Sequence, residues 1–140
     1  MLEAAFLALV LSVHDGDTIK VRTDAGVVQS IRIAHIDAPE LKQPWGRVSG
    51  KSLRTLCLGT YAWVQPQTID RYRRTVADVT CRGKDASHHQ VERGMAWVFV
   101  RYEPEGAPIY ATQARAQVAR RGLWMQTQAE APWHWRDARR

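Results

Sequence analysis

The amino-acid sequence predicts an α+β fold that is mainly β: a five-stranded Greek-key barrel of the OB type with about three appended helices. Two observations predict it. Three short strands follow one another at the start of the chain, and two further strands come after a helical segment that interrupts their order. The length of 140 residues suits one domain, with a core over about residues 7–124 and a tail over residues 125–140.

The first expected strand lies in the apolar segment at residues 4–13. Its leucines at alternate positions face one side, and Ala8 and Val10 face the other, which is the period of a strand. The same segment is apolar enough to resemble the centre of an export signal. However, Glu3 rather than a basic residue precedes it, and no cleavage-like break separates it from Asp15, so we interpret it as a strand.

The next two expected strands form a hairpin. Residues 18–22 and 27–33 each alternate in side-chain character, and residues 23–26 between them have the chemistry of a turn. Arg32 faces away from Ile31 and Ile33. Together with the first strand, these segments make a three-stranded meander, in which the start of the second strand lies beside the end of the third.

The rest of the chain predicts two more strands and the helices. We expect strands over residues 61–67 and 75–81, separated by a polar, cationic loop. We expect helices over residues 45–58, 86–93 and 109–121. The end of the tail, around residues 132–136, has no clear period.

The composition favours a polyanionic partner. Lysine and arginine number 20 against 14 acidic residues, which gives a net charge of +6, and 16 of the 20 are arginine. Arginine pairs with phosphate through two parallel hydrogen bonds, although a basic surface that serves only solubility explains the composition equally well. The apolar fraction of 45% excludes a mainly disordered chain. No stretch approaches the ~18 apolar residues of a membrane span, so we expect no membrane partner.

The two cysteines, Cys57 and Cys81, lack the C-x-x-C spacing of a metal site and leave two interpretations open. They could form a disulfide, or both could be buried as small apolar side chains. We favour the second interpretation, because Cys57 is expected on a helix face and Cys81 at the end of a strand.

Two short acidic segments are expected at the same end of the hairpin. The sequence DGDT at residues 15–18 connects the first two strands, and DAPE at residues 37–40 follows the third, with Arg32 at the same edge. A second arginine-rich segment, DRYRR, occupies residues 70–74. Carboxylates gathered in one place raise each other's pKa unless they share a cation, and arginines beside them suit phosphate oxygens. These residues predict a metal-assisted site for a phosphodiester.

Each acidic segment also has a simpler interpretation. Residues 15–17 could be only a tight turn, and residues 37–40 could be only the approach to a helix. Either interpretation could hold for one segment alone. Because both segments fall at the same end of one hairpin, we favour the site.

In this order and spacing, the segments resemble the staphylococcal-type nuclease (thermonuclease) family. Residues 94–98 (GMAWV) and 121–124 (RGLW) are also similar to later signatures of that family. The resemblance extends from about Leu7 to Trp124. It implies an OB-type barrel with three helices and a calcium-dependent phosphodiesterase, with one bound Ca²⁺, that acts on DNA and RNA. It also leaves export open, because the family is often secreted or periplasmic and no complete signal peptide is visible.

The resemblance assigns a role to each residue of the acidic and arginine-rich segments. Asp17 and Asp37 match carboxylates that bind the metal, and Ala38 matches a position that supplies its backbone carbonyl. Glu40 matches the carboxylate that orients or deprotonates the attacking water. Asp15 is expected to support the turn rather than to bind the metal. Two arginines match those that hold the scissile phosphate: Arg32 and Arg74.

The resemblance also suggests how substrate is held. Tyr72 and Tyr102 are similar to tyrosines that line the family's nucleotide pocket, and we add Arg71 to the substrate-binding candidates. We expect DNA or RNA as substrate, with single strands preferred, and a monomeric protein. Two histidines near the acidic segments, His14 and His35, are expected to be ordinary packing or surface residues.

One position departs from the family pattern. The family usually has glycine just before its second arginine, and this chain has Arg73. If that position requires a positive φ, an arginine there strains the turn. Arg73 could also compete for phosphate, so either Arg73 or Arg74 could be the working arginine.

Two other classes of function compete with the nuclease hypothesis. A non-catalytic OB-type module that only binds nucleic acid would not need the acids and arginines, yet all five of the main candidates are present. A protein-interaction domain would explain the six tryptophans but leaves the acidic cluster without a role.

Overall fold

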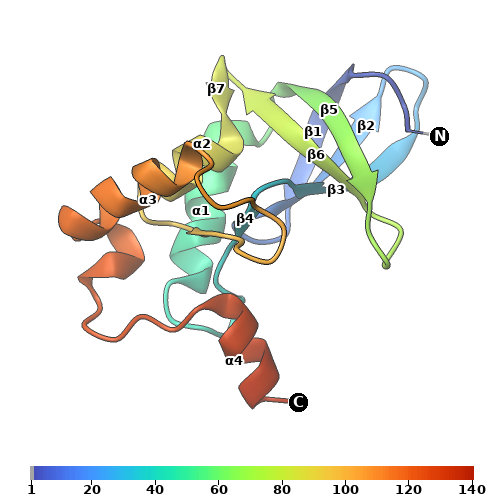
Figure 1. The fold of residues 1–140 in the computed structure, drawn as a ribbon. Helices are drawn as coiled ribbons and strands as arrows, with labels where there is room; N and C mark the ends of the chain where they lie inside the picture. Colours follow the sequence, from blue (N-terminus) through green and yellow to red (C-terminus); the bar gives the residue numbers. More distant parts are fainter. Residues whose placement is uncertain (1) are drawn as a thin grey trace.

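Five strands close into a barrel in the computed structural model, which describes residues 2–140 (Figure 1). The strand order is β3-β2-β1-β5-β6, and a parallel pairing of β3 with β6 completes the closure. The expected five-stranded barrel is thereby confirmed. The strands are β1 (Phe6–Val13), β2 (Thr18–Thr23), β3 (Val28–Ile33), β5 (Tyr61–Ile69) and β6 (Thr75–Cys81).

Three shorter strands accompany this barrel: two form a separate small sheet, and one pairs with a barrel strand. β4 (Ile36–Asp37) pairs antiparallel with β8 (Trp97–Val98), so the chain just after β3 is held against the segment that follows the second helix. β7 (Lys84–Asp85) pairs with the end of β6. The β4–β8 pair matters most for the candidate site, because it positions Asp37 opposite Trp97.

The expected meander is present, and its register places the acidic segments together. Thr18 is opposite Arg32 in the β2–β3 pair, so the start of β2 lies beside the end of β3. The connection from β1 to β2 is tight, because the backbone N–H of His14 donates to the carbonyl oxygen of Thr18 at 2.9 Å. In β1 the small inner face points to the core: Ala8 and Val10 are buried, whereas Leu7 is 54% exposed.

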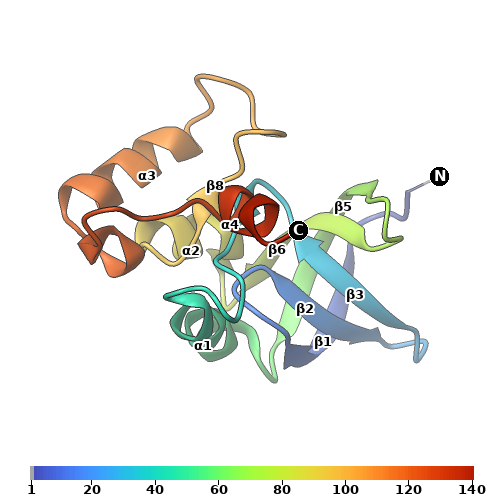
Figure 2. The same cartoon turned by 90° about the horizontal axis from the view of Figure 1, so that it is seen from below.

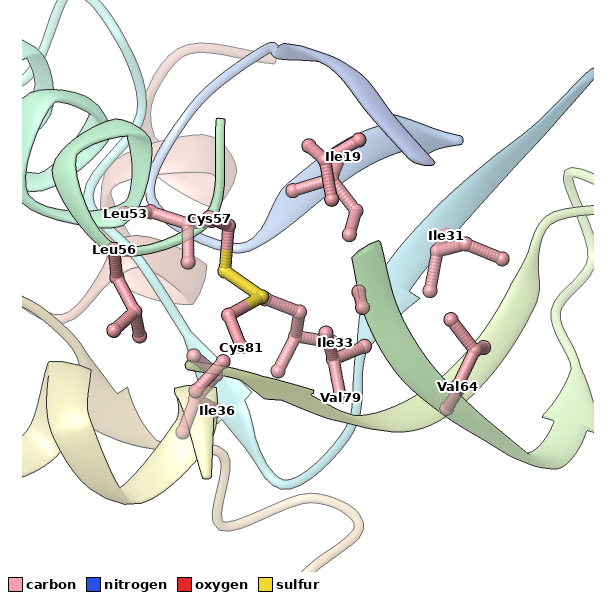
Figure 3. Packing of buried hydrophobic residues seen from close by; sticks show 14 of the residues in the cluster. Ile19, Ile31, Ile33, Ile36, Leu53, Leu56, Cys57, Val64, Val79 and Cys81 are labelled. Carbon is pink, nitrogen blue, oxygen red and sulfur yellow. A yellow bond between two sulfur atoms is a disulfide. The ribbon is translucent and has the colours of Figure 1, made fainter. Parts of the chain in front are cut away.

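The core fills the barrel and the space between the barrel and the first helix (Figure 3). β-Branched side chains dominate it, as expected for strands that bury one face. Its largest fully buried residues include Ile19, Val21, Ile31, Ile33, Ile36, Leu53, Val64 and Val79.

A disulfide crosses this core. Cys57, the last residue of the first helix, is bonded to Cys81, the last residue of β6, with a Cα–Cα distance of 5.3 Å (Figure 3). Our preference for two separate buried thiols was therefore wrong. Both cysteines are fully buried, as expected, but a pairing between elements 24 residues apart depends on tertiary packing, which spacing alone does not reveal.

Four α-helices accompany the barrel in the described residues, together with a 3-10 turn at Gly122–Met125. The expected number was about three, and the additional helix is α4, in the tail. The helices are α1 (Gly46–Cys57), α2 (Ala86–Glu92), α3 (Ile109–Val118) and α4 (Pro132–Ala138). Within residues 2–140, none of them is long and apolar enough to cross a membrane.

Helix α4 is held by aromatic packing rather than by an amphipathic period. The ring of Trp133 stacks on Phe99 at 5.5 Å between centroids and meets the edge of Trp97 at 5.7 Å. Pro132 begins the helix, where a missing N–H costs nothing. Seven residues are too few to show a clear helical period, which is why the sequence did not predict α4.

Candidate active site

Two buried carboxylates form the centre of the site. Asp17 immediately precedes β2, and Asp37 is the last residue of β4. Their exposed fractions are 5% and 2%. The hydroxyl of Thr18 donates to Asp17 Oδ1 at 2.9 Å, and the backbone N–H of Ala38 donates to Asp17 Oδ2 at 2.8 Å. The main chain of Ala38 therefore lies against Asp17, as the meander predicted.

Arg32 is shared between the two acids. Its Nη2 lies 3.4 Å from Asp17 Oδ2 and 3.3 Å from Asp37 Oδ1, while its Nη1 donates to the carbonyl oxygen of Ile33 at 2.8 Å. The guanidinium also lies 6.0 Å from the centre of the Phe99 ring. The structure thus brings together three of the residues that the sequence singled out: Asp17, Arg32 and Asp37.

The electrostatics of this cluster follow from burial. Burial, reinforced by the Asp17 charge, raises the pKa of Asp37 to about 6, although a hydrogen bond from an arginine opposes the shift. Burial and the same Asp17 charge raise the pKa of Asp15 to about 8. In Asp17 itself the effect of burial is outweighed by Arg32 and by hydrogen bonds, so its pKa is lowered. The cluster therefore concentrates carboxylate charge, which nearby cations stabilise.

Asp15 supports the turn, as expected. Its Oδ1 accepts a hydrogen bond from the backbone N–H of Asp17 at 3.1 Å. Gly16, between them, lies so close to Ser49 of α1 that any side chain there would collide with the serine. In addition, Gln90 of α2 donates to the carbonyl oxygen of Gly16 at 2.9 Å. The DGDT turn is therefore held against two helices.

Glu40 joins the cluster through a residue that the sequence did not single out, Arg136 of α4. Arg136 Nη1 donates to Glu40 Oε1 at 2.8 Å, and its Nη2 donates to Asp37 Oδ2 at 2.7 Å. Although burial opposes the shift, these bonds raise the pKa of Arg136. Nothing local distinguishes Arg136 from the other arginines of the tail, so no sequence signal identified it.

The main chain of Glu40 is also held in place. Its backbone N–H donates to Gln43 Oε1 at 3.1 Å, and Gln43 in turn donates to the carbonyl oxygen of Glu130 at 2.6 Å. Gly46, at the start of α1, is packed directly against the Glu40 carbonyl, where a Cβ atom would clash. These contacts fix the segment that carries Glu40 between α1 and the tail.

The arginine-rich loop between β5 and β6 is organised separately from the acids. Arg74 Nε donates to Asp70 Oδ2 at 2.8 Å, and hydrogen bonds from Arg74 outweigh burial and lower the pKa of Asp70. Within residues 2–140, no ion pair joins Arg74 to the acidic cluster. Arg73 has a φ of 64°, so this arginine does occupy the position that favours glycine.

The candidate substrate-binding side chains are accessible. Tyr72 is 65% exposed, and the guanidinium groups of Arg71 and Arg74 lie 5.0 and 5.5 Å from the centre of its ring. Tyr102 is 70% exposed and contacts Phe99 edge-on at 5.1 Å. Because Phe99 also faces Arg32, Tyr102 is connected to the acidic cluster by one intervening ring.

His35 has a definite structural role, which corrects our expectation of an ordinary packing or surface residue. Its Nδ1 lies 2.6 Å from Glu103 and its Nε2 lies 2.7 Å from Asp78, and it adopts a φ of 75°. The hydrogen bond to Asp78, supported by Glu103, raises its pKa to about 9. His35 therefore ties the turn before β4 to β6 and to the loop that carries Tyr102. His14 is exposed, as expected.

Comparison with known proteins identifies the chain. A family model described as "Staphylococcal nuclease homologue" matches residues 30–126, which include Arg32, Asp37, Glu40 and Arg74. The chain belongs to the staphylococcal nuclease family. It is a nuclease, and so a hydrolase, which confirms the resemblance and the enzyme class that its motifs predicted. Asp17 and Arg136 lie outside the matched residues.

Curated relatives of this nuclease come from bacteria and plants. It is 37% identical over 129 residues to a protein named "Uncharacterized endonuclease" from Escherichia coli O157:H7, covering 91% of this chain and 82% of the relative. It is 32% identical over 145 residues to "Micrococcal nuclease" from Shigella flexneri, covering 96% and 83%. "Staphylococcal-like nuclease CAN1" from Arabidopsis thaliana is 36% identical over 110 residues, covering 79% and 34%, so this chain spans about a third of that relative.

Proposed function

We propose that this nuclease is a calcium-dependent phosphodiesterase whose active site comprises Asp17, Arg32, Asp37 and Glu40. The observation that carries the proposal is that two buried carboxylates share one guanidinium, that of Arg32, at 3.3 and 3.4 Å. Arg136 adds a second guanidinium, but Arg32 and Arg136 together face three carboxylates, those of Asp17, Asp37 and Glu40. This excess of carboxylate beside arginine suits a site for a cation and a phosphate.

The donor set is compatible with calcium. Within residues 2–140, no three Asp, Glu, His or Cys side chains lie close enough together to hold a metal by themselves. Asp17, Asp37 and the backbone carbonyl of Ala38 would supply oxygen ligands, with water completing the six to eight oxygens that calcium accepts. Both oxygens of Asp37 accept hydrogen bonds from guanidinium groups, so Asp37 would share its charge between these groups and a cation. When bound, it would neutralise phosphate charge and acidify a water molecule.

Glu40 would act on the attacking water. Its Oε1 accepts from Arg136, and within residues 2–140 its Oε2 has no hydrogen-bond donor. The side chain is 39% exposed, so the second oxygen is accessible to water. Glu40 would orient this water toward phosphorus or accept its proton.

The arginines would act on the phosphate. Arg32 lies beside both acids, so its guanidinium would stabilise the charge that develops on a phosphate bound there. Arg74 would approach from the β5–β6 loop, where Asp70 holds it at 2.8 Å. We assign this role to Arg74 rather than Arg73, because Arg74 is the one that Asp70 orients. The high pKa of arginine makes full proton donation to the leaving oxygen unfavourable.

The substrate would be a nucleic-acid strand, DNA or RNA, with single strands preferred. Two exposed tyrosine rings, Tyr72 and Tyr102, would stack on bases that are not paired, and Arg71 would contact the backbone. Stacking of this kind requires unpaired bases, so we expect single strands to be cleaved in preference to duplexes. We expect the protein to act as a monomer, with residues 1–140 forming one domain.

Incubation with single-stranded DNA in calcium, in magnesium and in EDTA tests the proposal. We expect cleavage in calcium and none in EDTA. Cleavage that persists in EDTA would exclude metal dependence, and cleavage in magnesium alone would exclude calcium as the cofactor. Binding without cleavage in all three conditions would instead support a non-catalytic module that only binds nucleic acid.

A further inference from the structure

A basic cavity lies between helix α4 and the segment that follows β4. Its volume is about 410 Å³, and it opens beside Glu40. One wall carries Lys42, and the other carries Arg136, Arg139 and Arg140 from α4 and the end of the chain. The lining thus includes four cationic side chains against one carboxylate, which makes the cavity attractive to a polyanion.

Arg136 is occupied by Asp37 and Glu40, but the other three cations of this cavity, Lys42, Arg139 and Arg140, make no strong ion pair. Arg139 lies 4.0 Å from Glu130 and Arg140 lies 3.6 Å from Asp137, and both members of each pair are substantially exposed. Exposed pairs of this kind contribute little free energy. In the part of the chain that the structure describes, Lys42 makes no ion pair and is exposed. These charges are therefore available to a ligand.

Arg139 is held in an orientation suited to phosphate. Its guanidinium lies 3.1 Å from the centre of the Trp135 ring, which also lines the cavity, and its Nη1 donates to the carbonyl oxygen of Trp135 at 3.1 Å. A guanidinium stacked on an indole keeps most of its N–H groups at its edge, where they can pair with phosphate oxygens. Pre-orientation of this kind lowers the entropy cost of binding.

The cavity continues directly from the catalytic cluster. Arg136 lines it and at the same time binds Asp37 and Glu40, so α4 is anchored at the site. In the view of Figure 2, α4 and the loop that joins β5 to β6 lie on opposite sides of the C-terminal end of β3, the strand that carries Arg32. A strand held by the β5–β6 loop on one side of the site would therefore meet α4 on the other.

We propose that this cavity is a subsite for the phosphates of the nucleic-acid strand that flank the scissile bond. It extends the substrate interface of this nuclease beyond the nucleotide held by Tyr72 and Tyr102. The proposal rests on the proposed function, because it assumes that the cleaved bond lies at Glu40. The residues that form the subsite are Lys42, Arg139 and Arg140.

The test compares a double variant, K42Q/R139Q, with a matched control, R22Q/R54Q. Both lose two positive charges, but Arg22 of β2 and Arg54 of α1 are exposed and line no part of this cavity. Binding of a fluorescent single strand of about 12 nucleotides, a length that an OB fold can cover, is measured by anisotropy in EDTA over a range of salt concentrations. Cleavage of the same strand and of a dinucleotide is measured in calcium.

We expect K42Q/R139Q to bind the strand about tenfold more weakly than the control. For single strands the logarithm of affinity falls with the logarithm of salt by about 0.7 per phosphate contact, so the slope should decrease by about 1.4. The ratio of kcat/KM for the long strand to kcat/KM for the dinucleotide should also be lower in K42Q/R139Q than in the control. Millimolar inorganic phosphate could instead compete with the strand for the wild-type protein but not for K42Q/R139Q. That result would show a site for a free anion and overturn the assignment to a strand.

Equal slopes and equal strand preference in the two double variants would overturn the subsite, even if the wild-type protein cleaves DNA as proposed. Weaker binding by K42Q/R139Q alone, with no cleavage by any protein in calcium, would support the binding of strand phosphates in the cavity but contradict the proposed function. A wild-type protein that neither binds nor cleaves the strand would overturn both.

Discussion

Arg136 Nη2 lies 2.7 Å from Asp37 Oδ2, although the two residues are 99 positions apart in the sequence. The last helix of the chain therefore supplies a cation to the acidic cluster that the first hairpin builds. Arg32 and Arg136 together face Asp17, Asp37 and Glu40. This arrangement makes α4 part of the site rather than a separate tail.

Replacing Arg136 with methionine should lower the free energy of unfolding. The change keeps the aliphatic bulk but leaves Asp37, 2% exposed, without its closest cation. Removing one partner of a fully buried pair costs about 3–5 kcal/mol, and because Arg136 is 33% exposed we expect about 1–2 kcal/mol. Urea denaturation in EDTA at neutral pH measures the difference. Arg54→Met, on an exposed face of α1, serves as the control, and equal midpoints for the two variants would contradict the prediction.

Replacing Glu40 with glutamine should abolish most hydrolysis while retaining strand binding. Glutamine keeps an oxygen that can accept from Arg136, but it cannot take a proton from water. Loss of a general base typically lowers the rate by about 10²–10⁴-fold. Calcium-dependent cleavage and anisotropy of the same strand measure the two effects. Glu105→Gln, in an exposed loop, should cleave normally; wild-type rates for Glu40→Gln would exclude Glu40 from catalysis.

Replacing Arg73 with glycine should leave stability unchanged or raise it by up to about 1 kcal/mol. Arg73 has a φ of 64°, which costs a non-glycine residue about 1–2 kcal/mol. Glycine removes this strain, but it loses more backbone entropy on folding, which offsets part of the stabilisation. Thermal unfolding measures the change. The matched variant is Arg71→Gly in the same loop, where φ is not positive, so glycine should only destabilise. A larger loss for Arg73→Gly than for Arg71→Gly would show that the strain is absent.

Removing the disulfide should destabilise the barrel by about 3 kcal/mol. The bond closes a loop of 24 residues between α1 and β6, and the chain-entropy relation gives about this value for such a loop. The double variant Cys57→Ala with Cys81→Ala can be compared with the wild type by urea denaturation, with and without a reducing agent. The reductant should lower the wild-type midpoint and leave the double variant unaffected. Equal wild-type midpoints in both conditions would mean that the cysteines do not pair in solution.

The first hairpin of the barrel and the centre of the site follow from local pattern. Alternation over residues 18–33 specifies a hairpin, and hairpin geometry alone brings Asp17 beside Arg32 and the segment that begins at Asp37. The same pattern identifies the inner faces of β2 and β3. Such features are predictable because each depends on contacts between residues close in the chain.

Tertiary structure decided what completes the site and what holds the fold. Four features join segments that are distant in the sequence. They are the Arg136 contacts, the cavity along α4, the pairing of Cys57 with Cys81, and the position of His35 between Asp78 and Glu103. No period or spacing records such contacts, because they depend on how the helices pack around the closed barrel. The sequence by itself therefore determined the barrel, the enzyme class and the acidic pair, and only the packing of the tail on the barrel decided which cation reaches Asp37 and Glu40.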